Sequence, residues 1–203
     1  MWNVLAPEDI PSIVALLRTG NWDRQMAANK FRDFGQTALP ALCELLKDND
    51  ADNRNTVLQV LGQIGLPAKE AVPSIAEVLH DKDWRLHASA AVALGQIGPD
   101  AKQAVASLTA ALTDMEGDVR VCAIEALGRI GPESQAATSG LIERSHDDQP
   151  AVRSAAARAL GQIGSHAKAA VPDLEKLRHD PQEHVRRAAD EALAVISRHD
   201  SRH

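Results

Sequence analysis

The sequence has few aromatic residues and no long apolar run. Of its 203 residues three are Trp, two are Phe and none is Tyr, although 44% are hydrophobic. Alanine, leucine, valine and isoleucine must therefore form the core, which favours packed helices over a β-sandwich or barrel. No segment approaches the roughly 18 apolar residues of a membrane span, and the N-terminus lacks the basic region of a signal peptide. We expect a cytoplasmic protein with no membrane partner.

Cysteine and positive charge are also scarce. Cys43 and Cys122 lie far apart and neither belongs to a CxxC motif, so we expect two reduced, half-buried thiols. The chain has 22 basic and 28 acidic residues, a net charge of −6. Non-specific binding to nucleic acid depends on Lys and Arg, which release counterions from the phosphates. The charge balance therefore predicts no nucleic-acid partner.

What the sequence has in abundance is internal repetition, with a period of 33 residues. Five series keep this spacing: Leu61, Leu94, Leu127, Leu160 and Leu193; Ile64, Ile97, Ile130, Ile163 and Ile196; Gly62, Gly95, Gly128 and Gly161; Gly65, Gly98, Gly131 and Gly164; and Asp48, Asp81, Asp114, Asp147 and Asp180. A period this regular predicts a tandem array in which each unit stacks on its neighbours.

Each repeat contains two helical patterns. The first has apolar residues at helical spacing and ends in the motif LGQIG. The first glycine of this motif lets a neighbouring helix approach, and the second turns the chain with a positive φ. A proline such as Pro73 opens the second helix, where a missing N–H has no cost. We expect a half-repeat, five helical hairpins and a terminal helix, over residues 8–19, about 21–48, 49–81, 82–114, 115–147, 148–180 and 182–198.

The repeated unit is VRxxAxxALGxIGxxAxxAVPxL, most complete from Val152 to Leu174. It lacks the TPLH motif of ankyrin repeats and the W…LG…Y pattern of tetratricopeptide repeats. From Asn21 to Ile196 the chain resembles the short HEAT-like repeats of the phycobilisome-lyase type, a bacterial type of repeat. The resemblance implies an all-α fold, a right-handed α-solenoid (α-α superhelix) of HEAT-like hairpins, as a single domain over 1–203. Function is less constrained, because that class includes bilin lyase subunits, a di-iron hydroxylase and plain scaffolds.

Charged residues also repeat. Four aspartates precede an arginine by six residues, and Asp81 precedes His87 at the same distance; the pairs are Asp48 and Arg54, Asp114 and Arg120, Asp147 and Arg153, and Asp180 and Arg186. In HEAT-like arrays such residues form a ladder that ties the turn between repeats to the next helix. The alternative is a functional site, but a site has no reason to be copied in every repeat. We interpret the pairs as structural.

No catalytic or metal-binding pattern stands out. The hydroxylases in this repeat class hold two irons with His-Glu pairs, and none of the eight histidines here is followed by Glu. His80, His146 and His179 share one position, at the end of the second helix, where a cation complements the helix dipole. Phosphate-loop and serine-nucleophile motifs are absent. The sequence therefore predicts no enzyme, no cofactor and no metal.

The second helices of HEAT-like solenoids line the concave face, so their exposed positions are the candidate partner site. Stacking the repeats gives two rows: Ala15, Glu44, Glu77, Ala110, Glu143 and Lys176; and Arg18, Lys47, His80, Thr113, His146 and His179. The first row is small and acidic, which suits an inserted basic segment; a merely solvated face is the alternative. Imidazoles gain charge below about pH 6.5, so mild acid should weaken such binding.

For Trp22 and Trp84 in the turns we favour local turn packing; the alternative is that they are aromatic anchors for a partner. Phe31 and Phe34 replace a core Leu and Ile, so we assign both to the core. The favoured function is a non-enzymatic scaffold or adaptor that binds a partner protein on the concave face. The alternative is a subunit of a bilin lyase or a chromophore-handling chaperone. A DNA-repair-like protein would need a basic concave face, which the two rows do not supply.

Overall fold

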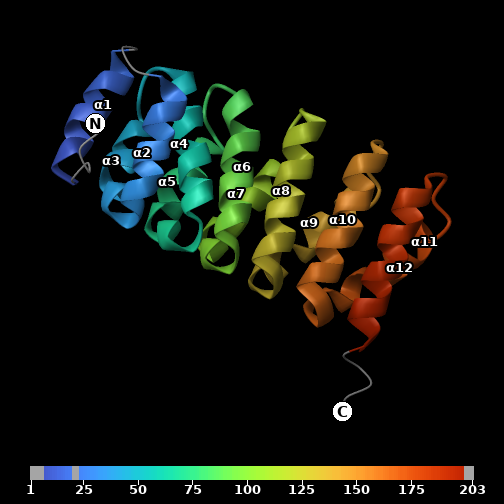
Figure 1. Ribbon diagram of the computed structural model, residues 1–203. Coiled ribbons are helices and arrows are strands. Elements are labelled where there is room, and N and C mark those ends of the chain that lie inside the picture. The colour runs from blue at the N-terminus through green and yellow to red at the C-terminus, as the bar shows by residue number, and fades with distance from the viewer. Residues whose placement is uncertain (1–6, 20–22, 199–203) are drawn as a thin grey trace. The chain divides into compact units, whose positions relative to one another are not determined.

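The computed structural model describes residues 7–19 and 23–198, and over these ranges the chain forms helices and turns but no strand (Figure 1). The predicted all-α repeat fold is confirmed. Trp22 lies outside the described residues. The chain divides into two compact units, Met1–Ile97 and Gly98–His203. The boundary falls inside a repeat, just after its first helix. The single domain expected over 1–203 stays a prediction.

The first unit contains the half-repeat and the first two hairpins, followed by one first helix. Its α-helices are α1 (Ile10–Arg18), α2 (Arg24–Phe34), α3 (Leu39–Leu45), α4 (Ala51–Ile64), α5 (Val72–Val78) and α6 (Arg85–Ile97), and its 3-10 segments are η1 (Pro7–Asp9), η2 (Gly35–Ala38) and η3 (Leu66–Ala71). The first helices α2, α4 and α6 pack side by side, and α3 and α5 pack on the first helix that follows each of them. The unit is therefore two layers of helices.

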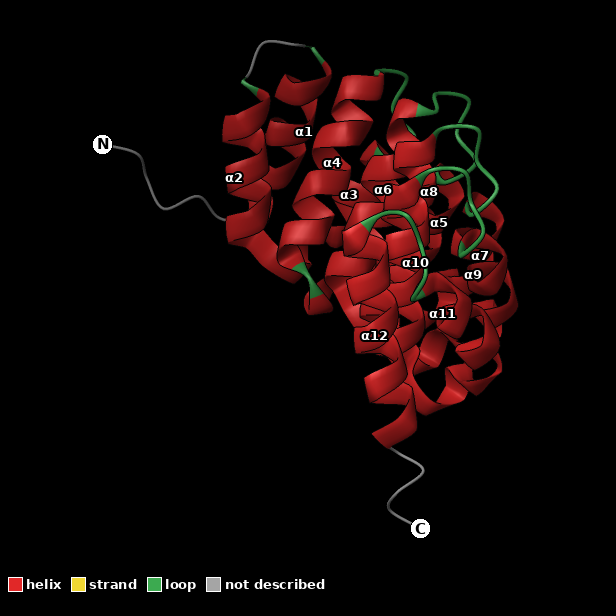
Figure 2. Cartoon of the chain, turned by 90° about the vertical axis from the view of Figure 1, so that its right-hand side faces the viewer, coloured by secondary structure: helices red, strands yellow, loops and turns green. Residues whose placement is uncertain are grey.

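The second unit repeats this architecture. Its α-helices are α7 (Val105–Ala111), α8 (Gly117–Ile130), α9 (Thr138–Arg144), α10 (Pro150–Ile163), α11 (Val171–Leu177) and α12 (Glu183–Arg198), and its 3-10 segments are η4 (Gly98–Ala104), η5 (Gly131–Ala137) and η6 (Gly164–Ala170). The first helices α8, α10 and α12 form one layer, and α7, α9 and α11 form the other. Figure 2 shows the two layers edge-on in each unit, with the turns between repeats gathered at one side.

Aliphatic side chains and alanine form the core of both units, as expected from the composition. Phe31 is the one aromatic side chain among the described residues that is fully buried, at 1% exposure. Phe34, which we also assigned to the core, is only half-buried, and so is Ile64 at the corresponding position of the next repeat. The same position is fully buried in the later repeats, at Ile97, Ile130 and Ile163. The repeat pattern of burial therefore does not extend to this position of the first hairpin, and the assignment of Phe34 to the core was wrong.

The two glycines of LGQIG have the roles that the sequence indicates. Gly65 ends α4 with a φ of 68°, a conformation that other residues rarely adopt. Gly161 lies where α10 crosses α12: a Cβ at this position would lie 2.9 Å from the Cα of Ala192. At Gly62 a Cβ would meet the side-chain oxygen of Gln96 and, at 3.1 Å, the Cα of Ala93. The glycine of one repeat thus lets the alanine backbone of the next come into contact.

The charged pairs form a ladder between repeats, and Arg153 shows how. Its Nη1 donates to the carbonyl oxygens of Asp147 and Asp148, at 2.9 and 3.1 Å, which holds the turn before α10. Its Nε and Nη2 donate to the carboxylate of Asp180 in the next repeat, at 2.7 and 3.1 Å. Asp180 also accepts a hydrogen bond from the backbone N–H of Gln182, at 2.9 Å. Each arginine therefore ties its own turn to the following one.

The same contacts recur in both units, which confirms the structural interpretation of the pairs. Arg54 binds the carbonyl of Asp48 and the carboxylate of Asp81, and Arg120 binds the carbonyl of Asp114 and the carboxylate of Asp147. Arg18 also takes part: its Nε donates to Asp48 at 3.2 Å. Arg18 is exposed, as its row predicts, with 51% of its side chain in solvent. Its guanidinium nevertheless extends from the end of α1 to the turn that holds Asp48.

We predict that Gly161→Ala destabilises the protein by about 1–3 kcal/mol, because the rigid backbone of α12 must move away from the added methyl group. The gain in helix propensity is about 1 kcal/mol and does not offset this. Chemical denaturation followed by circular dichroism measures the change. Gly117→Ala is the matched control, since its Cβ would meet only the side chain of Gln149, which can rotate. Equal stabilities for the two variants would contradict the close-approach role.

We predict that Asp180→Asn costs about 1–3 kcal/mol by weakening charged hydrogen bonds. The bonds from Arg153 hold the pKa of Asp180 below its ordinary value, against the effect of burial. Its contribution is therefore complete above about pH 3.9, the pKa of an unfolded Asp, and is lost as pH falls through the lower folded value. Denaturation curves from neutral to acid pH should converge for the two proteins. Asp190→Asn, whose partner Arg178 is half-exposed, should cost far less.

Candidate functional site

The two predicted rows are exposed on the second-helix layer of the first unit. Glu44 lies on α3 and Glu77 on α5, and both are exposed, as are Lys47 and His80 just beyond the helix ends. Lys47 Nζ lies 3.5 Å from Glu44, with both side chains about two-thirds in solvent. Glu77 forms no ion pair within the described part of the unit. The face presents two carboxylates one repeat apart.

A shallow groove of about 170 Å³ lies between α3 and α5, beside these carboxylates. Its lining combines small, apolar and charged residues: Cys43, Leu46, Lys47, Ser74, Glu77, Val78 and Asp81. Asp81 is held by Arg54 in the ladder, whereas the Glu77 carboxylate is exposed. The groove is large enough for one side chain and too small for a cofactor, for which pockets of about 300–1,000 Å³ are usual.

The rows continue on the second unit with a different charge pattern. The residues are Ala110, Glu143 and Lys176 in one row and Thr113, His146 and His179 in the other, and all six are exposed. The hydroxyl of Thr113 donates to the carbonyl oxygen of Ala110, at 3.0 Å. In this unit Glu143 is the one carboxylate of the first row, so the face is less acidic than that of the first unit.

Asp173 links the two rows of the second unit and was not anticipated. Its Oδ1 accepts from Lys176 Nζ at 2.8 Å and lies 3.1 Å from Nε2 of His146. The bond from Lys176, aided by His146, lowers the pKa of Asp173 despite partial burial. The corresponding residues in three other repeats are the uncharged Ser74, Ser107 and Gly140. The charge of Asp173 was therefore the one feature of the sequence that could have indicated its contacts with Lys176 and His146.

Trp84 is the candidate anchor that the structure describes. Its side chain is 54% exposed in the turn between α5 and α6, so local packing leaves more than half of it in solvent. Neighbouring Asp83 accepts two hydrogen bonds from the side chain of Arg85, at 2.9 and 2.6 Å. These bonds lower the pKa of Asp83 to about 2. Almost half of the Trp84 side chain is covered by its surroundings and the rest is exposed, so turn packing and a partner contact both stay predictions.

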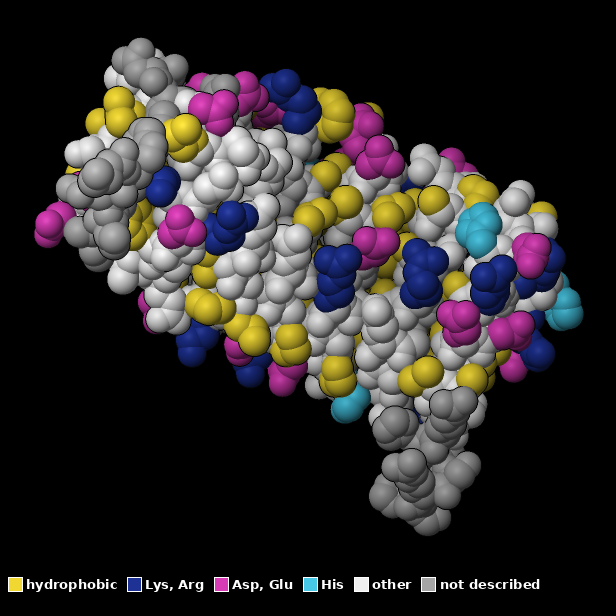
Figure 3. Space-filling view, in the orientation of Figure 1, with side chains coloured by type: hydrophobic (Ala, Val, Ile, Leu, Met, Phe, Trp, Pro, Cys, Tyr) yellow, Lys and Arg dark blue, Asp and Glu magenta, His cyan; other side chains and the backbone are white. Residues whose placement is uncertain are grey.

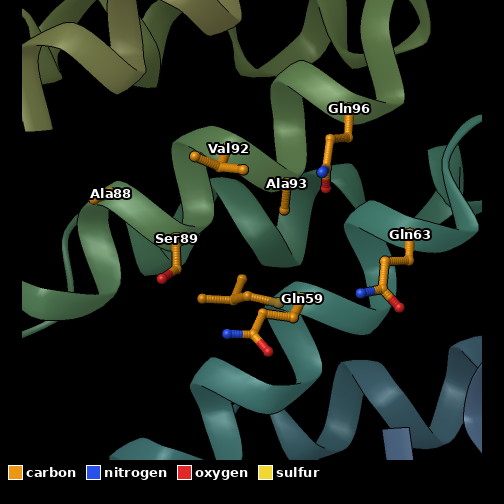
Figure 4. Close-up of a pocket in the computed structure, with 8 residues that line it drawn as sticks. Gln59, Gln63, Ala88, Ser89, Val92, Ala93 and Gln96 are labelled. Atoms are coloured by element: carbon orange, nitrogen blue, oxygen red, sulfur yellow. The ribbon is translucent and has the colours of Figure 1, made fainter. Parts of the chain in front are cut away.

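A second groove, of about 250 Å³, lies on the opposite layer between α4 and α6 (Figure 4). The side chains around it are amides, a hydroxyl and small or aliphatic groups: Leu58, Gln59, Gln63, Ala88, Ser89, Val92, Ala93 and Gln96. None of them is charged. The sequence analysis missed this groove, although the lack of charged residues at the exposed positions of both helices was a readable signal.

Over residues 7–19 and 23–198 no three His, Cys, Asp or Glu side chains come together as metal ligands. Cys43 and Cys122 are free and half-buried, as predicted. None of the helices described is both long and apolar enough to cross a membrane.

The fold and the repeated contacts define a helical-repeat protein, and the comparison with known families makes the class specific. The chain belongs to the HEAT repeat family, whose model matches residues 39–114 and 105–194. No curated protein matches the sequence.

Solved structures show the same fold at low sequence identity. A designed armadillo repeat protein in complex with the peptide (KR)4 superposes with a TM-score of 0.70 at 19% identity, covering 93% of this chain and 99% of that one. The archaeal HEAT-like repeats protein from Thermococcus onnurineus NA1 has a TM-score of 0.68 at 16% identity, covering 96% and 82%. The complex of CpcE and CpcF of phycocyanin lyase from Nostoc sp. PCC7120 has 0.66 at 24% identity, covering 77% and 64%.

We predict that both thiols react slowly with an aromatic disulfide reagent at neutral pH. Burial raises the pKa of Cys43 and of Cys122, so the reactive thiolate is rare in the folded protein. Absorbance at the reagent's product band follows the reaction. The unfolded chain in guanidinium is the control and should react much faster. Equal rates in the folded and unfolded chain would show that burial does not protect the thiols.

Proposed function

We propose that this protein is a non-enzymatic binding module that holds a basic segment of a partner protein against the second-helix rows of its first unit. The observation that carries the proposal is the pair of exposed carboxylates Glu44 and Glu77, one repeat apart, of which Glu77 lines a groove that fits one side chain. Repeat solenoids present their residues one per repeat along a stack, which suits an extended partner. The fold is typical of protein-interaction scaffolds.

The ion pair of Glu44 with Lys47 is weak enough for a Lys or Arg of a partner to replace Lys47. The ion pair of Glu44 with Lys47 is long and highly exposed, and such pairs contribute at most about 1 kcal/mol. Glu77 is exposed and unpaired within the described part of its unit. A partner with two or more Lys or Arg residues can form ion pairs with both carboxylates, and breaking the pair of Glu44 with Lys47 costs little. Trp84, exposed in the adjoining turn, supplies apolar contact area to the same unit.

A structural neighbour supports the choice of a basic partner. The designed armadillo repeat protein with a similar fold is in complex with (KR)4, a peptide of alternating Lys and Arg. The two proteins share a fold at 19% identity, and this likeness does not carry binding residues over to this chain. The attraction to a basic peptide therefore has to come from this chain's own carboxylates. The same peptide is therefore a suitable probe.

We predict that fluorescein-labelled (KR)4 binds the full chain and that Glu44→Gln with Glu77→Gln weakens binding about tenfold or more, since each lost charge pair is worth roughly 1 kcal/mol. Fluorescence anisotropy at low and high salt measures the affinity. Binding should also weaken with added salt. Glu70→Gln is the matched control, because Glu70 is exposed in η3 of the same unit but outside the rows.

An affinity that is unchanged in the double variant, or reduced equally by Glu70→Gln, would show that the rows are not the peptide site. In that case the negative net charge of the chain alone would explain attraction of the peptide.

A second candidate function is a subunit of a bilin lyase or a chromophore-handling chaperone. The observation that favours it is the fold shared with the CpcE and CpcF complex of phycocyanin lyase. A free bilin mixed with the purified chain would then acquire a shifted visible absorption band. An unchanged spectrum together with binding of (KR)4 separates the two functions.

A further inference from the structure

The exposed side of α4 and α6 is uncharged beyond the first turn of each helix. Its side chains are here called the amide face: Asn55, Gln59, Gln63, Ser89, Val92 and Gln96. Figure 3 shows this region as a largely white surface, whereas dark blue and magenta alternate over α10 and α12. In a chain in which 25% of the residues are charged, an uncharged side two helices wide is a distinct feature.

Depletion of charge is the compositional mark of the centre of a protein interface. A purely solvated face has no need to exclude Lys and Glu, which are good helix formers and keep the surface soluble. The amide face also carries an aliphatic side chain, Val92, at 39% exposure beside the groove of about 250 Å³. Its composition therefore indicates a contact surface rather than a solvated one.

Several hydrogen-bonding groups of the amide face are free to bind a partner. Gln59 is exposed and forms no hydrogen bond with the described residues. Gln63 accepts one bond, from Arg32 at 3.2 Å, and keeps its NH₂ group. Each amide both donates and accepts, so the surface is complementary to another amide surface.

We propose that the amide face binds a second copy of this chain, in a two-fold symmetric dimer. Two chains that each carry a net charge of −6 repel one another, and the repulsion is least where neither presents a charge. A two-fold axis places the same residues on both sides, which amides satisfy because they pair with themselves. The ridge that carries Gln59 or Val92 in one copy enters the groove between α4 and α6 of the other (Figure 4).

The size of the face sets the strength of the contact. A helix of 14 residues such as α4 is about 21 Å long. Helices about 10 Å apart then give about 400 Å² over α4 and α6, the part of this layer that carries no charge beyond the first turns. Stable interfaces bury about 800 Å² per partner. The dimer is therefore weak, with a dissociation constant in the micromolar range.

Charge-swapped variants test the proposal on the full chain. Gln59→Glu with Val92→Glu places like charges on both sides of the contact, and Gln59→Lys with Val92→Lys does the same with the opposite sign. Sedimentation velocity at about 5 to 200 µM, around the expected micromolar constant, should show the wild type dimerising with rising concentration and each variant remaining monomeric. An equimolar mixture of the two variants should form dimers again, because the Glu residues of one chain then face the Lys residues of the other. This holds wherever the two-fold axis crosses the amide face.

The control is Glu44→Gln with Glu77→Gln, which alters the opposite layer and should dimerise as the wild type does. This separates the dimer from the proposed peptide site, since either can fail while the other holds. Circular dichroism confirms that the variants fold, as Glu and Lys both favour helices. A wild type that stays monomeric at the highest concentration, or a variant mixture that does not associate, would overturn the proposal.

Discussion

The close contact between consecutive first helices is the constraint on which the rest of the structure depends. A single hairpin cannot cover its own apolar side, so each must lie against the next. Gly62 and Gly161 have no side chain at the crossing, and the backbone of Ala93 or Ala192 fills the space. This contact sets the spacing of the repeats in each unit. It also explains why alanine, leucine and valine suffice for the core while aromatic residues are scarce.

The Arg–Asp ladder ties the turn of each repeat to the turn of the next. It also gives most of the repeated Arg and Asp residues a structural role, so they are not candidates for a functional site. Arg54, Arg120 and Arg153 each bind a turn carbonyl of their own repeat and a carboxylate of the next. Asp147 shows the balance of forces: burial raises its pKa, but the bonds from Arg120 and from the N–H of Gln149 outweigh burial, and its pKa is lowered. These groups hold the turns in place and leave the helix faces to bind partners.

The two layers of the first unit differ in chemistry, and each suits a different kind of contact. The second-helix rows present carboxylates, which attract cations over a distance and respond to salt. The amide face presents groups that pair only on contact and are insensitive to salt. A module that recognises a basic partner on one layer and itself on the other can bring two such partners together. Bivalent binding of this kind raises avidity without any new contact.

The sequence by itself determined the helical-repeat fold and the exposure of the row residues that the structure describes, because a period of 33 residues fixes which side of every helix is buried. It also identified the ladder, since its aspartate recurs in all five repeats and an arginine follows four of these aspartates at the same distance. The period could not predict features that differ from one repeat to the next. Asp173 occupies a position where other repeats have Ser or Gly, and its contact with His146 joins two repeats.

Only the tertiary structure decided how single side chains divide their contacts. Arg18, although exposed, also binds the ladder residue Asp48, Trp84 is about half in solvent, and Phe34 is only half-buried. The groove of the amide face exists because α4 and α6 lie side by side with small residues between them. The physical reason is common to all four: periodicity fixes which side of a helix is buried, whereas the reach and packing of one side chain depend on the helix beside it.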